Sequence, residues 1–495
     1  MSLYEIVAKR AEADILFIPY IEGKSLEESC EAAKELSKSF SSSGILEDFS
    51  GKEGEVAILY PPLGQESRIC LIGLGKNPSL STFRDSYATA VRKCLPLGCQ
   101  TANVLFPQIE TPEDVLIACF EGLLLGNYLF KKYKTHKDQK QKESLFSQFS
   151  LVTKTSSQQL DEQCEIASSI YFTRDLVNTN ADEITPAKLA DIAIDMGKTR
   201  KNLRVEVLDK QEIEKLGMGL LLAVNRGCSH EPKLIVFHYE GDPSSSRKAA
   251  FIGKGVTYDT GGLSLKPTQF MNGMKADMGG AASVFGLIDA LSRLQVKKNV
   301  IGVVPTTENG IDANSYKVGD IYTSYLGKTV EIDNTDAEGR LILADALSYT
   351  AKNYKPDFMV DLATLTGAIV IALGEDYTGV FSNNRALEEA LQQASSRQGE
   401  NFWAMPLHQK YFSLLKSDFA DTKNSGSREA SSITAALFLK EFIEELPWAH
   451  LDIAGCAFRS KESGAHPKNA SGEPVRTLVE FVRSLEENTW KEIGQ

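Results

Sequence analysis

Short runs of β-branched and apolar residues alternate with amphipathic stretches along the first 150 residues. Strands are predicted by the runs ADILFIPY, GEVAILYPP, SRICLIGLG and TANVLFP. Helices are predicted by the apolar spacing of SLEESCEAAKELSKSF and TPEDVLIACFEGLLLGNY. This alternation predicts a smaller N-terminal α/β domain, which we assign to residues 1–160.

A single long helix is predicted next by SSQQLDEQCEIASSIYFTRDLVN, and we assign residues 161–180 to it as a linker. Strand candidates then resume as LRVEVLD, PKLIVFHYEG, KAAFIGKGVTY, NVIGVVPTT, PDFMVDLATLTGA and AHLDIAGCAF. Helical stretches such as AASVFGLIDALSRL and RLILADALSYTAKNY separate them. Residues 181–495 are therefore expected to form a second, larger α/β domain around a mostly buried sheet.

Composition and charge narrow the class of protein. With 42% hydrophobic and 24% charged residues, the chain has the composition of a soluble globular protein. The formal net charge of −12 argues against nucleic acid as the main partner. The lysine-rich segment 131–143 is interpreted as a solvated loop, with a phosphate-binding patch as the alternative.

Targeting signals are not found. Glu5, Glu12 and Asp14 interrupt what would have to be the apolar core of a signal peptide. The most apolar tract, Leu362 to Gly374, has 13 uncharged residues, short of the roughly 20 that span a bilayer. The eight cysteines form no CxxC pair and are interpreted as reduced thiols. We expect a cytoplasmic protein without a membrane segment.

A glycine-rich loop after a predicted strand carries the first candidate chemistry. In FIGKGVTYDTGGLSLKP, Lys254, Asp259 and Lys266 follow the apolar run, where open α/β sheets bind ligands. A nucleotide loop fails on spacing, because GxxxxGK[ST] is absent and Tyr258 replaces the third glycine of GxGxxG.

Two further acidic clusters follow. Taken alone, Asp277 is interpreted as the N-cap of the next helix, and the turn DNTDAEGR as a capped loop. Taken together, the clusters supply four carboxylates, namely Asp259, Asp277, Asp336 and Glu338. Their charge matches that of two divalent cations, and such a pair of cations activates a water and stabilises an oxyanion. All six histidines lie outside these clusters, which excludes HExxH zinc chemistry, and His450 is interpreted as a structural residue.

The motif NTDAEGRL at residues 334–341 resembles the signature of the leucyl aminopeptidase (cytosol aminopeptidase) family. Further blocks match in the family's order over residues 170–485, namely GKGVTYDTGGLSLKP, MKADMGGAA, DLATLTGA, SDFADTKNSGS and WAHLDIAG. The first 150 residues match only in their α/β character, as is usual for the variable N-terminal domain of that family.

The resemblance implies a two-metal aminopeptidase that releases N-terminal leucine and other apolar residues from peptides during intracellular turnover. It implies five metal ligands, of which Asp259 and Glu338 bridge the two ions: Lys254, Asp259, Asp277, Asp336 and Glu338. Lys266 would polarise the scissile carbonyl, and Arg340 would hold a bicarbonate that acts as general base on the attacking water. Mn²⁺ is the expected ion, with Zn²⁺ as the alternative.

The resemblance also assigns the pocket for the first side chain and the assembly. Met274, Thr364, Leu365 and Gly367 match the positions that line this pocket, and a homohexamer is implied. The segments NTNADEITP and TKNSGSREASSITAA depart from the family pattern, which affects loops and assembly contacts but no implied ligand. Two other hypotheses stay open at this point, a DNA-binding regulatory member of the family and an inactive structural homologue.

Overall fold

The structure is a computed structural model, and it describes residues 3–36, 48–61, 64–109, 112–135 and 144–494. The chain divides into two compact units. The N-terminal unit comprises Met1–Ala167 together with the later segment Lys461–Lys468, and the C-terminal unit comprises Ser168–Ser460 and Asn469–Gln495. The point of division lies inside helix α6 (Gln159–Asn178). Of the lysine-rich segment, residues 136–143 lie outside the described residues.

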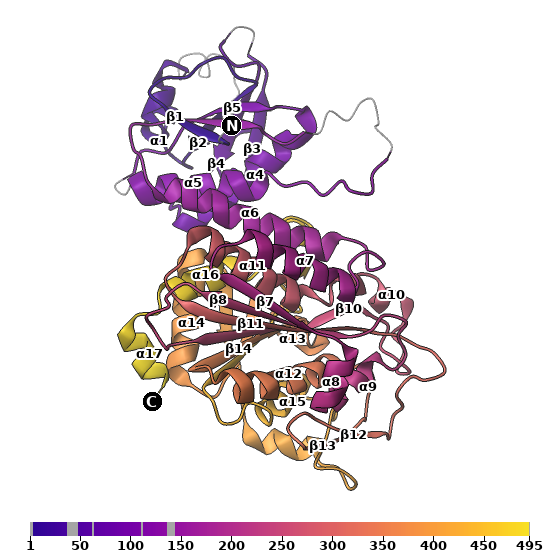
Figure 1. The fold of residues 1–495 in the computed structure, drawn as a ribbon. Helices are drawn as coiled ribbons and strands as arrows, with labels where there is room; N and C mark the ends of the chain where they lie inside the picture. Colours follow the sequence, from indigo (N-terminus) through magenta and orange to yellow (C-terminus); the bar gives the residue numbers. More distant parts are fainter. Residues whose placement is uncertain (1–2, 37–47, 62–63, 110–111, 136–143, 495) are drawn as a thin grey trace. The chain divides into compact units, whose positions relative to one another are not determined.

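The N-terminal unit is built on a six-stranded sheet in the order β1-β6-β5-β2-β4-β3, coloured indigo to purple in Figure 1. Neighbours are parallel except β3 and β4, which are antiparallel. The strands are β1 (Tyr4–Val7), β2 (Ile15–Tyr20), β3 (Val56–Leu59), β4 (Ile69–Gly73), β5 (Thr101–Val104) and β6 (Gln148–Val152).

Two long helices, α4 (Leu80–Cys94) and α5 (Pro112–Gly126), lie side by side in this unit. They pack closely because α5 carries Gly122 and Gly126 at the contact, where a Cβ would lie 2.2 and 2.5 Å from the carbonyl oxygens of Arg84 and Ala88. The shorter helices are α1 (Leu26–Ser29), η1 (Glu31–Ala33) and η2 (Leu95–Leu97). The helix predicted from Ser25 onward is interrupted after Ser29, because Cys30 has extended backbone angles.

The C-terminal unit is built on a nine-stranded sheet in the order β16-β15-β18-β14-β9-β11-β8-β7, with β10 pairing on β11. The central strands β9 and β14 are buried along their whole length. The strands are β7 (Leu203–Leu208), β8 (Lys233–Glu240), β9 (Ala249–Gly253), β10 (Gly255–Asp259), β11 (Asn299–Asn309), β14 (Phe358–Ala363), β15 (Tyr377–Ser382), β16 (Asn401–Ala404) and β18 (Trp448–Asp452).

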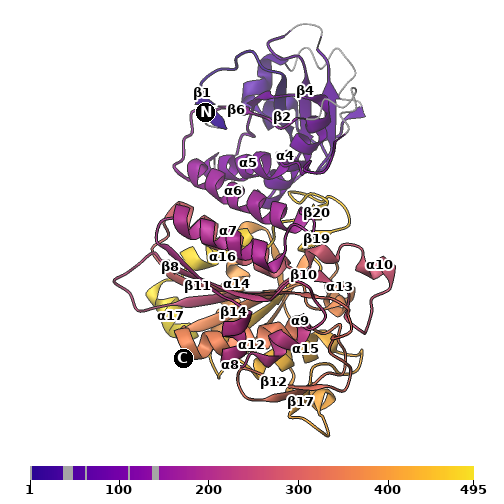
Figure 2. The same cartoon turned by 45° about the vertical axis from the view of Figure 1, so that its right-hand side comes forward.

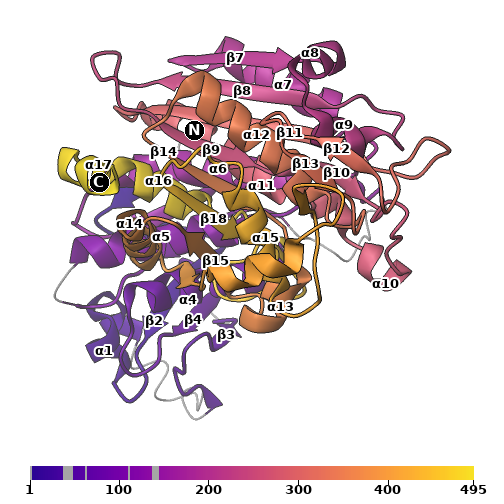
Figure 3. The same cartoon turned by 90° about the horizontal axis from the view of Figure 1, so that it is seen from below.

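Helices cover both faces of this sheet, with α7, α11 and α16 above it and α12 and α15 below it in Figure 1. The view from below in Figure 3 shows α12 and α15 in front of the strands. The helices of this unit are α7 (Pro186–Thr199), α8 (Lys210–Leu216), α9 (Gly219–Asn225), α10 (Thr268–Met271), η3 (Met274–Ala276), α11 (Gly279–Leu294), α12 (Gly339–Tyr354), α13 (Gly367–Leu373), α14 (Arg385–Gln398), η4 (Gln409–Leu415), α15 (Ser431–Lys440), α16 (Val475–Arg483) and α17 (Glu487–Ile493).

Two small sheets complete the C-terminal unit. One consists of β12 (Ile321–Thr323), β13 (Thr329–Glu331) and β17 (Thr422–Lys423), and the other of β19 (Phe458–Arg459) and β20 (Asn469–Ala470). The predicted fold class is confirmed, a smaller N-terminal α/β unit and a larger C-terminal α/β unit around a mostly buried sheet. Within the described residues, no helix combines the length and apolarity needed to cross a membrane.

The run KAAFIGKGVTY, predicted as one strand, is two strands that part at Lys254. β9 ends at Gly253, whereas β10 begins at Gly255 and pairs with the far end of β11, Gly255 lying opposite Thr306. The Lys254 amide still donates to the Leu362 carbonyl of β14, at 2.9 Å. The break places Lys254 at the C-terminal edge of the sheet, the edge at which open α/β sheets bind ligands.

Candidate metal centre and adjoining cavity

The ends of several elements meet at this edge, where β10, α10, α13 and β19 lie on the same side of the C-terminal unit in Figure 2. Lys254 follows β9, Asp259 ends β10, and Glu338 immediately precedes α12. The Lys254 side chain runs directly over Gly339, where a Cβ would lie 2.6 Å from the lysine Cε. A glycine after Glu338 is therefore needed for the lysine to reach the carboxylates.

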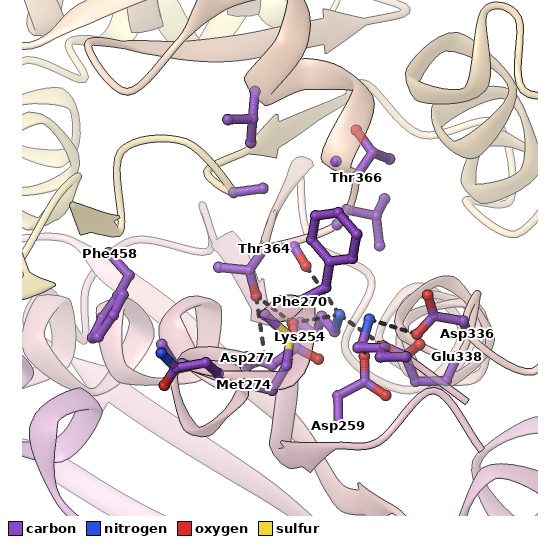
Figure 4. Close-up of a pocket in the computed structure, with 18 of the residues that line it drawn as sticks. Lys254, Asp259, Phe270, Met274, Asp277, Asp336, Glu338, Thr364, Thr366 and Phe458 are labelled. Atoms are coloured by element: carbon purple, nitrogen blue, oxygen red, sulfur yellow. Dashed lines mark hydrogen bonds and ion pairs between the residues drawn. The ribbon is translucent and has the colours of Figure 1, made fainter. Parts of the chain in front are cut away.

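Lys254 is a buried ammonium between two buried carboxylates (Figure 4). Its Nζ lies 2.8 Å from Asp277 Oδ1 and 2.8 Å from Glu338 Oε1, and it donates to the Thr364 carbonyl at 3.0 Å. Burial lowers the pKa of Lys254, but the surrounding carboxylates outweigh burial and hold this pKa well above its usual value.

Lys266 neutralises the other half of the cluster. Its Nζ lies 2.9 Å from Asp259 Oδ2 and 2.5 Å from Asp336 Oδ1. Burial lowers the pKa of Lys266, but the surrounding carboxylates outweigh burial and hold this pKa above its usual value. Burial, followed by the charges of Asp259 and Glu338, raises the pKa of Asp336 to about 6. Two ammonium groups thus stand against four carboxylates.

The donor set fits divalent cations. One oxygen from each of Asp259, Asp336 and Glu338 lies within 4.8 Å of the others, close enough to share an ion. Asp277 Oδ2 is buried and finds no hydrogen-bond partner among the described residues. Burial raises the pKa of Asp277 well above normal even beside Lys254, as expected for a carboxylate short of positive charge. Oxygen ligands and one amine suit Mn²⁺ and Zn²⁺.

Neighbouring polar groups fix the orientation of the carboxylates. Asp259 Oδ1 accepts hydrogen bonds from Asn309 Nδ2 and from the Gly261 amide, each at 2.8 Å. Asp277 Oδ1 accepts a hydrogen bond from Thr364 Oγ1 at 2.7 Å. Such contacts hold metal ligands in place before an ion arrives.

A cavity of about 450 Å³ opens directly from this cluster. Met274, Thr364, Leu365 and Gly367, which the sequence suggests for the side-chain pocket, all line it. Sequence reasoning missed the other apolar residues of the lining, which are Leu265, Pro267, Phe270, Ala276, Val370, Ala454 and Phe458. In Figure 4 the ring of Phe458 lies to the side of Met274, and that of Phe270 lies above Lys254. The cavity is therefore charged at one end and apolar at the other.

Arg340 differs from the other predicted site residues, because it does not line this cavity. It is buried, and Nη1 donates to the Asn424 carbonyl at 2.8 Å. Its Nε has no hydrogen-bond partner among the described residues. Burial lowers the pKa of Arg340 to about 10, which leaves the guanidinium charged at neutral pH.

The interpretation of Asp277 as an N-cap is wrong. Met278 occupies the N-cap position of α11, and no side chain caps that helix end. The Asp277 carboxylate instead turns to Lys254 and Thr364. The structural interpretation of His450 agrees with its contacts, since it is fully buried with Nδ1 2.6 Å from Asp361 Oδ1. All eight cysteines lie in the described part of the chain and are free thiols.

Comparison with known proteins identifies the family. The catalytic-domain model of the cytosol aminopeptidase family matches residues 171–479, and the model of its N-terminal domain matches residues 17–137. The chain therefore belongs to the cytosol aminopeptidase family, whose members are metal-dependent peptide hydrolases.

Relatives match over nearly the whole chain. A "Probable cytosol aminopeptidase" of Protochlamydia amoebophila is 45% identical, with 97% of each chain covered. The protein of the same name from Chlamydia trachomatis serovar D is 44% identical, covering 96% of this chain and 97% of the relative. The expectation that the first 150 residues match the family only in their α/β character is therefore wrong, because the N-terminal family model and these identities extend the likeness to that part of the chain.

Two solved structures share the fold. A mutant tomato leucine aminopeptidase superposes with a TM-score of 0.86 at 31% identity, covering 97% of this chain and 96% of that one. The bottromycin maturation enzyme BotP in complex with Mn superposes with a TM-score of 0.83 at 32% identity, covering 95% and 99%.

Proposed function

We propose that this chain removes single residues from the free amino ends of peptides, with a preference for leucine and other apolar side chains. The observation that carries this proposal is the cavity itself, in which carboxylates and two lysines adjoin an apolar lining. A free α-amino group suits the charged end, because it can ligate a cation there. The substrate's first side chain suits the apolar end.

Five side chains would hold two divalent cations, namely Lys254, Asp259, Asp277, Asp336 and Glu338. When bound, the cations supply Lewis-acid polarisation of the scissile carbonyl and a water of lowered pKa. Lys254 would act as a neutral amine, since a nearby dication disfavours its proton. Lys266 would stay charged and donate to the carbonyl oxygen as negative charge develops there.

Mn²⁺ is the cation we propose first and Zn²⁺ second, because oxygen donors predominate and the similar BotP structure holds Mn. We also propose that Arg340 would hold a bicarbonate, which would supply a general base for the reaction. The support for this role is the buried Arg340 Nε, which offers a charged donor without a partner among the described residues.

All residues that line the cavity belong to the C-terminal unit. We therefore propose that residues 181–495 carry out the reaction, that residues 161–180 form a linker helix, and that residues 1–160 serve assembly or regulation. A role in cytoplasmic peptide turnover completes the proposal.

We further propose a homohexamer. Ile371 and Phe419 of the C-terminal unit are 79% and 80% exposed, which suits burial against other copies. Light scattering should give a mass near six times the 54.3 kDa of one chain. A mass near 54.3 kDa would contradict the assembly.

The reaction is tested with leucine p-nitroanilide and its N-acetylated form, each given to the Mn²⁺-loaded protein. We expect rapid release of nitroaniline from the free-amine substrate and none above background from the acetylated one. Equal cleavage of both would contradict an aminopeptidase, and cleavage of neither would favour an inactive homologue.

A further inference from the structure

Asp452 is a fully buried carboxylate that sequence reasoning did not single out. It is the last residue of β18, opposite Ala363 of β14 and Gly379 of β15. Burying a carboxylate is unfavourable unless several hydrogen bonds compensate it. The groups that donate hydrogen bonds to Asp452 therefore indicate which part of the structure it stabilises.

Three donors converge on Asp452. Its Oδ1 accepts hydrogen bonds from the amides of Leu365 and Ala454, both at 3.2 Å. Its Oδ2 accepts a hydrogen bond from Thr366 Oγ1 at 2.6 Å. All three donor residues line the cavity next to the metal centre.

These donors come from two separate turns. Leu365 and Thr366 lie between β14 and α13, and Ala454 lies in the turn after β18. Asp452 thus joins the two turns that form one side of the cavity. A neutral Asn offers a single acceptor oxygen, so only a carboxylate satisfies all three donors as they are placed.

The first of these turns is also held from the metal side. Thr364 donates from Oγ1 to Asp277 at 2.7 Å, and its carbonyl accepts from Lys254 at 3.0 Å. The turn is therefore fixed at both ends, by the metal centre at Thr364 and by Asp452 at Leu365 and Thr366. Freeing the second end would let the pocket side move while the metal ligands stay in place.

We propose that Asp452 is a positioning residue that fixes the shape of the side-chain pocket and so sets the discrimination between large and small first residues. This inference rests on the proposed aminopeptidase function. The role proposed for Asp452 is to position Leu365, Thr366 and Ala454, and it requires no contact between Asp452 and the reacting groups.

The test compares Asp452→Ala with the same substitution at a second buried carboxylate, Asp345. Asp345 is also fully buried and also accepts three hydrogen bonds, all from backbone amides: those of Leu220, Leu221 and Tyr325 at 2.9, 3.0 and 2.7 Å. None of those three donors lines the cavity. Asp345→Ala therefore carries a similar loss of buried hydrogen bonds without touching the pocket.

The readout is the ratio of kcat/KM for leucine p-nitroanilide to kcat/KM for alanine p-nitroanilide. In Asp452→Ala we expect this ratio to fall about tenfold, which is the discrimination that about one methylene group in an apolar pocket provides. The fall should come mainly from a higher KM for leucine p-nitroanilide. Bound Mn²⁺ per chain should stay unchanged. In Asp345→Ala the ratio should match the wild type.

An unchanged ratio in folded Asp452→Ala, or an equal fall in Asp345→Ala, would overturn the inference. If Asp452→Ala does not fold, Thr366→Val decides, because it replaces the hydroxyl donor by a methyl group of similar size. We expect a smaller fall there, and an unchanged ratio would overturn the inference. A wild type that does not favour leucine over alanine would instead refute the proposed specificity on which the inference rests.

Discussion

The Lys254 ammonium lies 2.8 Å from a carboxylate oxygen of Glu338, with both side chains buried. Glu338 thereby joins the half of the cluster around Asp277 to the half around Asp336. Removing its charge should therefore weaken binding at both of the proposed cation positions. This makes Glu338 the most informative single position to change.

We expect Glu338→Gln to lower kcat/KM for leucine p-nitroanilide by more than about 100-fold. Losing a residue that only hydrogen-bonds to a metal ligand costs up to about 100-fold, and losing a ligand itself should cost more. Asp333→Asn is the matched control, because Asp333 is an exposed acid in the same turn, 3.5 Å from Lys423. Its activity should stay within twofold of the wild type. Retained activity in a folded Glu338→Gln protein would refute the assigned metal centre.

Asn309 should tune cation affinity without binding a cation itself. Its Nδ2 donates to Asp259 at 2.8 Å and to the Thr335 carbonyl at 3.0 Å. Asn309→Ala removes one of the two hydrogen bonds that orient Asp259 Oδ1, and we expect the apparent Kd for Mn²⁺ to rise about 10- to 100-fold. Activity measured against free Mn²⁺ tests this, with exposed Asn353→Ala as the control. Equal Mn²⁺ affinities in the two variants would contradict it.

His450 should make stability depend on pH. Burial lowers the pKa of His450, but the Asp361 carboxylate 2.6 Å away outweighs burial and raises this pKa above 6.5. The native state therefore binds a proton more tightly than the unfolded state does. The resulting stabilisation is complete below pH 6.5 and is lost as pH rises through the native value.

Urea unfolding of wild type and His450→Gln at several pH values between 6 and 9 checks this prediction. The difference in unfolding midpoint should be largest at the acid end and should shrink steadily toward pH 9. A difference that stays constant or grows with pH would show that His450 is neutral in the native state.

The charged half of the site is predictable from sequence because its residues cluster in three short motifs. Lys254, Asp259, Asp277, Asp336 and Glu338 all follow strands or precede helices in a recognisable pattern, and the structure brings them together. The charge of the four carboxylates groups them as a candidate cation site, because adjacent carboxylates repel one another, whereas Lys254 is suggested as a ligand only by the family resemblance.

Local rules failed where a long-range contact prevailed. Asp277 looks like an N-cap, but the buried Lys254 ammonium offers a stronger partner than backbone amides do. The continuous apolar run around Lys254 looks like one strand, yet its two halves pair with different parts of the sheet. Periodicity does not contain this information, because it depends on which strands become neighbours.

The apolar half of the cavity was only partly predictable for a related reason. Phe270 and Phe458 stand 188 positions apart and carry no local signal that separates a pocket aromatic from a core aromatic. The assignment of Lys461–Lys468 to the N-terminal unit could not be predicted from sequence either, because it depends on contacts of a segment that lies near the end of the chain.

Metal stoichiometry tests the central claim most directly. Chelated protein is titrated separately with Mn²⁺, Zn²⁺ and Mg²⁺, and bound ions per chain are measured alongside hydrolysis of leucine p-nitroanilide. The account predicts that activity appears only with added ion and is complete at two bound ions per chain, with Mn²⁺ the most effective. Full activity in the metal-free protein, or saturation of both binding and activity at one ion per chain, would contradict it.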